Sequence, residues 1–396
     1  MSISTKILIG LVLGIFVGLG LGAEGAKTAD LWIAPFGSAF LGLIRMIIVP
    51  LVLSSLVVGA ASVGDIRKVG RMGGKTFCLY LLTTAVAIAL GLMLGTVMQP
   101  GVGISMAAAQ AAKAATSPSI VTVILGLIPS NPMDALLKGD MLKIIVFALF
   151  LGIGSVAVGE RAKPLVNFFD ALAEVMYKIV HWIMILAPIG VFALIVPVVA
   201  KNGPSVLLPL AKVIFAVYLG CALQIVLVYF PLVKSVGINP IEFLKKAAPA
   251  QLVAFSTCSS GGTLPVSMTC ADDMGVDRRV SSFVLPLGAT INMDGTALYQ
   301  GVCALFIAQV YGIDLTVSQY VMIILSGTLA SIGTAGVPGA GLIMLTLVLQ
   351  TVGLPLEGLA LVAGIDRILD MPRTAVNITG DIAVSAVVGK SEEKYL

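Results

Sequence analysis

The chain has 396 residues, of which 58% are hydrophobic and only 11% are charged, with a formal net charge of +4. Soluble domains carry about 25% charged residues, so this composition excludes an ordinary soluble enzyme and indicates a protein surrounded by lipid. No basic tract points to a nucleic acid partner, and five cysteines without paired spacing and a single histidine offer no zinc or redox framework.

Apolar runs long enough to cross a bilayer occupy the first two thirds of the chain, near residues 6–23, 34–63, 76–98, 119–157, 164–199 and 205–234. The first run could instead be a secretory signal peptide. Its length and the equally apolar segments that follow favour a transmembrane helix. Several runs are too long for one straight span, so we expect tilts or breaks, with kinks at Pro50 and Pro188. The Ala/Gly/Ser-rich segment 99–118 is predicted to be a flexible external connection.

Basic residues fall in alternate loops, at 67–75, 161–163, 245–246 and 278–279. By the positive-inside rule these loops face the cytoplasm, and so do both termini of a protein of the cytoplasmic membrane. The first loop, Gly70 to Thr76, looks like a phosphate-binding loop. However, Val69 occupies the position of its first glycine and no soluble strand precedes it, so we interpret it as a cytoplasmic turn.

After residue 240 the apolar stretches are interrupted by polar, glycine-rich clusters at 259–265, 292–296, 333–339 and 377–381. Backbone can unwind at membrane depth only where protein or a water-filled cavity satisfies it. The order of the clusters is a two-fold repeat, in which a Gly/Ser/Pro-interrupted segment is followed by a broken or polar helix. Such a repeat is typical of a transporter whose site lies near the membrane midplane.

The last span carries polar residues at spacings of three to four, which places them on one stripe about 100° wide: Asp366, Asp370, Arg373, Thr374, Asn377 and Asp381. A face with several charges cannot contact lipid, because each charge would cost several kcal/mol. The stripe therefore faces either a polar cavity or a salt-bridge ladder between helices. The three accompanying clusters favour the cavity.

The residue types predict what the cavity binds. Arg373 offers a planar fork for a carboxylate, and Asp370, less than a turn away, offers a partner for an ammonium group. This pair suits an acidic amino acid. The cluster 292–296, together with Asn377 and Asp381, supplies the oxygen ligands that hard cations prefer, and sodium is the natural occupant. The Asp294-Gly295 pair could instead be a simple kink.

The Gly/Ser/Pro segments would place backbone N–H groups at half-helix ends, where they attract an anionic group. The second of these segments is rich in glycines that would let it flex as a gate: Gly333, Gly336, Gly339 and Gly341.

The four clusters, in this order and spacing, resemble those of the glutamate/aspartate transporter family, the sodium:dicarboxylate symporters. The resemblance covers essentially the whole chain and is most specific in residues 258–381. It implies an all-α polytopic membrane fold with eight transmembrane helices and two re-entrant helical hairpins in inverted repeats. It further implies a homotrimer that works by an elevator motion.

In the domain organisation that the resemblance implies, residues 1–75 and 119–200 (spans one, two, four and five) form the scaffold that holds the trimer. Residues 76–98 and 201–396 form the moving transport part. This part contains spans three, six, seven and eight and the two hairpins, near 240–275 and 317–352.

The resemblance also implies roles for individual residues. Arg373 would bind the side-chain carboxylate of the substrate and Asp370 its amino group. The remaining substrate contacts would come from Thr296, Thr374, Asn377, Ser260 and the backbone of Val337 and Gly341. One sodium site would use Asp381 with carbonyls of Gly288, Asn292 and Asn377. A second would use Thr290, Met293, Ser331, Ile332 and Thr334. A third would use Asp294, Asn292, Tyr80, Thr83 and Thr84.

The chain departs from the family pattern at the first hairpin and in the last span. Cys258 stands where archaeal members have an arginine, and Gly261 stands where a serine is common. Animal members carry the arginine at the position of Met371. Arg367, one turn earlier, could replace that charge, or it could snorkel or pair with Asp366. The short chain ends lead us to expect no regulatory domain.

These features predict a symporter, not an enzyme, that couples sodium entry to uptake of aspartate or glutamate. Asp294 and Asp381 favour sodium over protons. The alternatives are a proton- or sodium-coupled carrier for a C4-dicarboxylate or a neutral amino acid, and an ion channel. An intramembrane hydrolase would need a base near Ser259 or Ser260, and His181 is far away in sequence.

Overall fold

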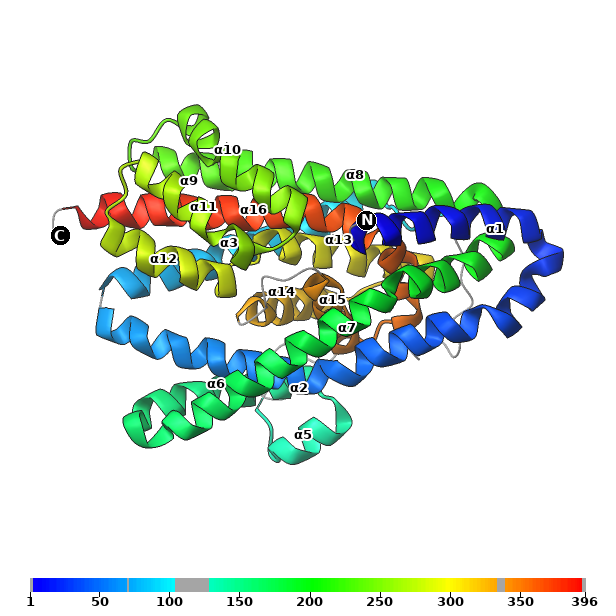
Figure 1. The fold of residues 1–396 in the computed structure, drawn as a ribbon, viewed down its shortest axis with the longest axis horizontal. Coiled ribbons are helices and arrows are strands. Elements are labelled where there is room, and N and C mark those ends of the chain that lie inside the picture. The colour runs from blue at the N-terminus through cyan, green and yellow to red at the C-terminus, as the bar shows by residue number, and fades with distance from the viewer. Residues whose placement is uncertain (1–2, 70, 104–127, 333–338, 394–396) are drawn as a thin grey trace.

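The structure is a computed structural model that describes residues 3–69, 71–103, 128–332 and 339–393. In these ranges the chain forms helices and connecting loops and contains no strand. Most of the long helices extend along the long axis of the molecule, as Figure 1 shows. Helical stretches long and apolar enough to cross a membrane are Thr5–Trp32, Ala34–Ala61, Arg71–Met98, Lys143–Lys201 and Gly203–Lys234.

One group of helices comes from the first half of the chain. It consists of α1 (Ile3–Trp32), α2 (Ala34–Val69), α6 (Met141–Val158) and α7 (Lys163–Asn202), with the short α5 (Pro132–Lys138) beside it. Helix α7 packs along both α1 and α2, and α6 packs on α2. In Figure 1 these helices form the lower and right-hand part of the molecule.

The helices of this group deviate from straight rods in ways that the sequence predicted only in part. The long apolar run at 119–157 is interrupted, because Gly139, with φ 66°, ends α5 before α6 begins; residues 119–127 lie outside the described ranges. Pro50 lies inside α2 and Pro188 inside α7. The non-helical backbone of Gly22 inside α1 has no counterpart in our predictions.

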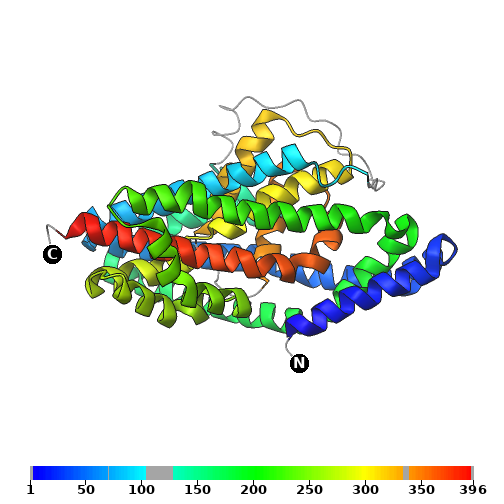
Figure 2. The same cartoon turned by 90° about the horizontal axis from the view of Figure 1, so that it is seen from above.

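A second group surrounds the C-terminal helix α16 (Leu359–Glu392). Helix α16 contacts α8, α12 and α13, and Figure 2 shows it side by side with α8. Helix α13 also packs along α3. The members of this group are α3 (Arg71–Met98), α8 (Leu207–Gln224), a π-helical turn (Ile225–Tyr229), α9 (Phe230–Lys234), α12 (Arg278–Ile291) and α13 (Asp294–Val310).

Two helix pairs occupy the segments that the sequence marks as interrupted: α10 (Pro240–Thr257) with α11 (Ser260–Asp273), and α14 (Val317–Ser331) with α15 (Ala340–Val352). The helices of each pair pack on each other. Helix α10 ends because Cys258 adopts a left-handed conformation (φ 53°), and the Ser259 side chain then caps α11. The α10–α11 pair lies against α12 and α16, whereas the α14–α15 pair lies between α13 and the first group.

The two polar clusters inside long helices behave differently. Asn292 and Met293 leave the helical conformation, so α12 ends at Ile291 and α13 begins at Asp294. By contrast, α16 continues through Asn377 to Asp381 without a break. Of the two alternatives that the repeat predicted, the first cluster is therefore a broken helix and the second a polar but continuous one.

An ion-pair cluster joins the start of α3 to the end of α16. Arg71 Nη2 lies 2.7 Å from Glu392 Oε2, and Lys75 Nζ lies 2.7 Å from Glu392 Oε1. The start of α3 and the end of α16 therefore lie at the same end of the bundle; residues 71–76, which we interpreted as part of a turn, belong to α3.

Candidate functional site

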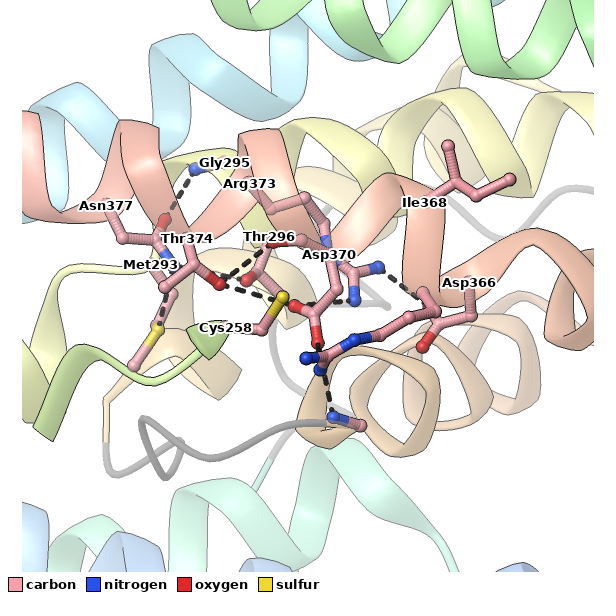
Figure 3. A network of polar contacts seen from close by, with 12 residues as sticks. Cys258, Met293, Gly295, Thr296, Asp366, Ile368, Asp370, Arg373, Thr374 and Asn377 are labelled. Carbon is pink, nitrogen blue, oxygen red and sulfur yellow. Dashed lines mark hydrogen bonds and ion pairs between the residues drawn. The ribbon is translucent and has the colours of Figure 1, made fainter. Parts of the chain in front are cut away.

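A buried charge cluster lies on α16. The Arg373 side chain is fully buried, and its Nη1 donates to Asp366 Oδ1 at 2.9 Å while its Nη2 lies 3.0 Å from Asp370 Oδ1. Figure 3 shows the three side chains together. Both carboxylates belong to the same helix as the arginine, so within the described part of the chain Arg373 forms no ion pair to another helix. Its charge is balanced locally, as burial of an ion requires.

The other faces of the Arg373 guanidinium are shaped by α13 and α15. Its Cζ lies 4.0 Å from the centroid of the Tyr299 ring, within the range of a cation–π interaction. A side chain at Gly341 would approach Arg373 Nη2 to 2.8 Å, so only glycine lets α15 pack this closely. Arg373 Nε has no hydrogen-bond partner among the described residues. The guanidinium therefore retains a donor for a further anionic group.

Asp370 connects the two helix pairs. Its Oδ2 accepts a hydrogen bond from the Gly339 N–H, at the start of α15, at 3.3 Å. The same oxygen lies 3.9 Å from Arg367 Nη1, and Arg367 Nη2 donates to the Thr257 carbonyl, the last residue of α10, at 3.4 Å. Arg367 thus pairs with Asp370, whereas the sequence suggested Asp366. Its guanidinium also reaches the turn in which Cys258 lies.

The helix break brings the start of α13 against α16. Asn377 Oδ1 accepts a hydrogen bond from the Gly295 N–H at 2.7 Å, so it satisfies one of the N–H groups that a helix N-terminus leaves unpaired. Asn377 Nδ2 lies 3.3 Å from Met293 Sδ and 3.4 Å from Thr296 Oγ1. Thr374 Oγ1 bonds the Asp370 carbonyl at 2.9 Å. The predicted substrate residues on α13 and α16 therefore form two bonded groups, one around Asn377 and one around Asp370 and Arg373 (Figure 3).

The residues of the first predicted sodium site also lie together. Asn292 Nδ2 donates to Asp381 Oδ1 at 2.9 Å and to the Asn377 carbonyl at 3.3 Å. A side chain at Gly288 would lie 2.4 Å from Asp381 Oδ1, which places that backbone beside the carboxylate. Asn292 Oδ1 is buried and has no hydrogen-bond partner among the described residues. This donor set is rich in oxygen and fits a hard cation.

The third predicted site is built around Asp294, whose side chain is completely buried. Thr84 Oγ1 donates to Asp294 Oδ1 at 2.7 Å. Asp294 Oδ2 accepts from Tyr229 Oη at 2.7 Å and from Gln224 Nε2 at 3.3 Å. The sequence analysis missed the last two residues. Their only signal was polar character inside the apolar run 205–234.

Among the described residues of the second predicted sodium site, no side-chain hydrogen bond joins one member to another. Thr290 Oγ1 donates to Leu287 O at 2.9 Å and Ser331 Oγ donates to Thr328 O at 2.7 Å, so both stay within their own helices. Ile332 is buried directly after α14. Thr334 and Val337 lie outside the described residues, as does most of the predicted gate at 333–339.

One further candidate position can be placed. Ser260 is buried at the start of α11, beside the turn at Cys258. The described residues contain no group of three His, Cys, Asp or Glu side chains that could hold a metal. A cation at one of the predicted sodium sites would therefore be bound largely by amide, hydroxyl and carbonyl oxygens, with at most two carboxylates.

A cavity of about 350 Å³ lies between α7 and α16. Asp366, Arg367 and Asp370 line it from α16, and His181 and Met184 line it from α7. Most of the remaining wall is apolar, with contributions from α1, α2 and α15. Of the polar stripe on α16, Asp366 and Asp370 thus line this cavity, whereas Arg373, Thr374, Asn377 and Asp381 do not, so the prediction that the whole stripe faces a cavity holds only in part.

The model of the sodium:dicarboxylate symporter family matches residues 3–391, nearly the whole chain. The chain belongs to the sodium:dicarboxylate symporter family. Over 403 residues it is 41% identical to a proton/sodium-glutamate symport protein of Geobacillus stearothermophilus, covering 100% of this chain and 95% of the relative.

Other members of the sodium:dicarboxylate symporter family are similar over the same length. The chain is 39% identical to a proton/glutamate-aspartate symporter of Escherichia coli, covering 100% of this chain and 94% of the relative. It is 32% identical to a C4-dicarboxylate transport protein of Bacillus subtilis, with the same coverage. Membership in this family, together with the membrane-length apolar helices, establishes a membrane transporter and not an enzyme.

Proposed function

We propose that this chain is a secondary active symporter that couples the inward flow of sodium to the uptake of aspartate or glutamate. The observation that supports it most is the pairing of Arg373 with Asp370 on one helix, where Asp370 lines the cavity between α7 and α16. A receptor with one cationic and one anionic group suits a zwitterion that carries an additional carboxylate. Relatives that are named glutamate symport proteins support the same cargo.

In this proposal the cargo takes over contacts that α16 makes within itself. The side-chain carboxylate of the cargo binds Arg373, whose Nε–H edge has no described hydrogen-bond partner. The cargo ammonium binds Asp370 in place of Arg373 Nη2. The remaining polar atoms of the cargo bind Thr296, Thr374, Asn377, Ser260 and the backbone of Val337 and Gly341.

Sodium binding would use the oxygen-rich sets around Asp381 and Asp294, and the set of Thr290, Met293, Ser331, Ile332 and Thr334. The first two sets have buried carboxylates with amide or hydroxyl groups next to them, which supports a hard monovalent cation. Protons are the alternative coupling ion, because the names of several relatives include protons.

The proposed assembly is a homotrimer in the bacterial cytoplasmic membrane, with both termini in the cytoplasm. Each protomer would have eight spans and two re-entrant hairpins, the α10–α11 and α14–α15 pairs. The helices α1, α2, α5, α6 and α7 would form the scaffold. The rest of the described chain would move against it as an elevator, with the cavity between α7 and α16 at the sliding boundary.

Uptake into liposomes tests the function directly. Purified protein is reconstituted with choline inside, and labelled aspartate is added outside in sodium, potassium or choline buffer. We expect accumulation above the external concentration only with an inward sodium gradient. Equal uptake in all three buffers would contradict sodium coupling. Accumulation driven by an inward proton gradient alone would assign the proton instead.

A C4-dicarboxylate is the second candidate cargo, because the chain is 32% identical to a transport protein for that class. Asp370 argues against a cargo without an amine, and Arg373 against one without a second acid group. Excess unlabelled succinate, serine and glutamate, each added to the aspartate assay, separate these cargoes. We expect only glutamate to compete strongly. Saturable uptake without uncoupled ion current would exclude a channel.

A further inference from the structure

Two polar side chains of the α8–α9 segment converge on a single oxygen of Asp294. Tyr229 Oη donates to Asp294 Oδ2 at 2.7 Å, and Gln224 Nε2 donates to the same atom at 3.3 Å. Both side chains are completely buried in a segment that is long and apolar enough to cross a membrane. Buried polar groups cost free energy unless they are paired. Neither residue belongs to the ligand sets proposed above.

The backbone between the two residues explains how both can reach one atom. In an α-helix, at about 100° per residue, side chains five positions apart point about 140° away from each other. The intervening residues Ile225–Tyr229 form a π-helical turn. Because this turn takes an extra residue, it rotates Tyr229 back toward the side on which Gln224 lies. The π-helical turn thus allows Tyr229 and Gln224 to contact Asp294 from the same side of the helix.

Helix α16 holds the Tyr229 hydroxyl from the other side. The hydroxyl lies 3.3 Å from the Val376 carbonyl. A side chain at Gly380 would approach Tyr229 Oη to 2.6 Å and Asn292 Nδ2 to 2.7 Å, so the glycine provides the space for both groups. Tyr229 is therefore wedged between the Asp294 carboxylate and the backbone of α16, and it has little freedom to move.

The two oxygens of Asp294 consequently have different surroundings. Oδ2 faces the α8–α9 segment and accepts two hydrogen bonds there, whereas Oδ1 faces α3 and contacts Thr84 Oγ1 at 2.7 Å. Gln224 Nε2 also donates to the Thr83 carbonyl at 3.2 Å, which fixes the α3 backbone at the same place. Thr83 and Thr84 belong to the sodium site proposed on α3.

We propose that Tyr229 and Gln224 are positioning residues for sodium: they anchor Asp294 Oδ2 so that Oδ1 is held toward α3 as a cation ligand. Ligands held in place by fixed neighbours bind more tightly than ligands that must be ordered on binding. This inference rests on the proposed sodium coupling. It adds a pair of side chains that do not touch the ion but determine how much sodium is needed.

The test compares Tyr229→Phe with Tyr218→Phe. Tyr218 also extends from α8 and donates to α16, at the Ile368 carbonyl, but it has no contact with Asp294. The thermal unfolding temperature of purified protein is measured against sodium concentration, with choline keeping the ionic strength constant. Loss of a hydrogen bond to a charged group should raise the half-saturating sodium concentration of Tyr229→Phe about tenfold. Tyr218→Phe should match the wild type.

Transport separates positioning from a general structural effect. In liposomes at saturating sodium, we expect Tyr229→Phe to retain the wild-type KM for aspartate within about twofold, while its sodium dependence is shifted as in the unfolding experiment. Gln224→Met keeps the shape of the side chain but removes the donor, and it should shift the sodium dependence in the same direction. If Tyr229→Phe does not fold, Gln224→Met alone is used to test the inference.

Two results would overturn the inference alone. In the first, the wild type responds to sodium, and Tyr229→Phe and Gln224→Met show the same sodium dependence as the wild type. In the second, the substitutions lower the unfolding temperature by the same amount with and without sodium. A wild type without any sodium response would instead overturn the proposed coupling itself and the inference with it.

Discussion

The guanidinium of Arg373 lies over the ring of Tyr299, with Cζ 4.0 Å from the ring centroid. Both residues are completely buried. Tyr299 lies about one and a half turns into α13. The helix that begins after the Asn292–Met293 break therefore also supplies the aromatic ring against which the Arg373 guanidinium packs. The break and the charge cluster are therefore parts of one site.

This contact can be tested with two substitutions at Tyr299. Tyr299→Phe keeps a ring face under the guanidinium, whereas Tyr299→Leu removes it. A desolvated cation–π contact is worth about 2 kcal/mol, so Tyr299→Leu should weaken aspartate binding about 10- to 30-fold. Tyr299→Phe should stay within about threefold of the wild type. Equal losses in both variants would show that the ring face is not what matters.

Arg373→Cys should abolish uptake of acidic amino acids, because it removes the guanidinium proposed to bind the cargo carboxylate. Among the described cations near this site, only Arg367 could form the same bidentate contact. Arg367 is already held by Asp370 and Thr257. We expect aspartate affinity to fall at least about 100-fold. Neutral amino acids such as serine should gain affinity. The measurement is competition of labelled substrate in liposomes.

The same substitution leaves Asp366 and Asp370 without their partner, so loss of folding has to be excluded. Size-exclusion chromatography and the unfolding temperature in detergent provide that control. Arg279→Cys is a matched variant, since Arg279 is exposed and forms an ion pair with Asp277, two residues earlier. Unchanged aspartate affinity in a folded Arg373→Cys protein would contradict the proposed role of Arg373.

Arg367 is expected to adjust the site and not to be essential for it. It is partly exposed and reaches both Asp370 and the end of α10 over rather long distances, 3.9 and 3.4 Å. Arg367→Ala should therefore weaken aspartate binding about three- to tenfold. Adding Cys258→Arg, which places a guanidinium in the neighbouring turn, should recover part of the loss. A double variant no better than Arg367→Ala would show that the position of the charge, and not its presence, is decisive.

The ion-pair cluster at the end of α16 predicts a pH dependence of stability. Hydrogen bonds from Arg71 and Lys75 lower the pKa of Glu392 from its ordinary 4.5 to about 2. The contribution of Glu392 to stability is thus fully present above about pH 4.5 and is lost as the pH falls toward 2. Since both partners are partly exposed, Glu392→Gln should lower the unfolding temperature at pH 7 by only about 1–3 °C.

A pair of unfolding curves checks this prediction. The difference between wild type and Glu392→Gln should shrink in high salt and at the lowest pH that the protein tolerates. Glu393→Gln provides the control, because Glu393 pairs with Lys390 on the same helix and does not join α16 to α3. A difference that is independent of salt would contradict an electrostatic origin.

The sequence was most informative where one helix face or one local break decides the structure. The spacing of Asp366, Asp370 and Arg373 placed them on a single face, and the Asn292–Met293 pair marked the end of a helix. Such features depend on periodicity and local conformation. They do not require knowledge of which helices become neighbours.

Contacts between distant segments could not be predicted in the same way. Arg367 reaches Thr257, 110 positions earlier, only because the α10–α11 pair packs against α16. Gln224 and Tyr229 reach Asp294 only because a π-helical turn lies between them. Nothing in their spacing signals that turn. The close approach of Tyr229 and Asn292 to Gly380 of α16 is likewise a contact between segments far apart in the sequence.

Asp370 Oδ2 has a further consequence for which molecules are carried. It accepts from Gly339 on α15 and lies near Arg367, which holds the end of α10. A cargo amine that replaces Arg373 Nη2 at Asp370 Oδ1 and reaches across to Oδ2 draws an acceptor away from both helix pairs in a single event. An anion without an amine can occupy Arg373 and leave that oxygen undisturbed. Such compounds, held weakly through Arg373 alone, should therefore not be translocated.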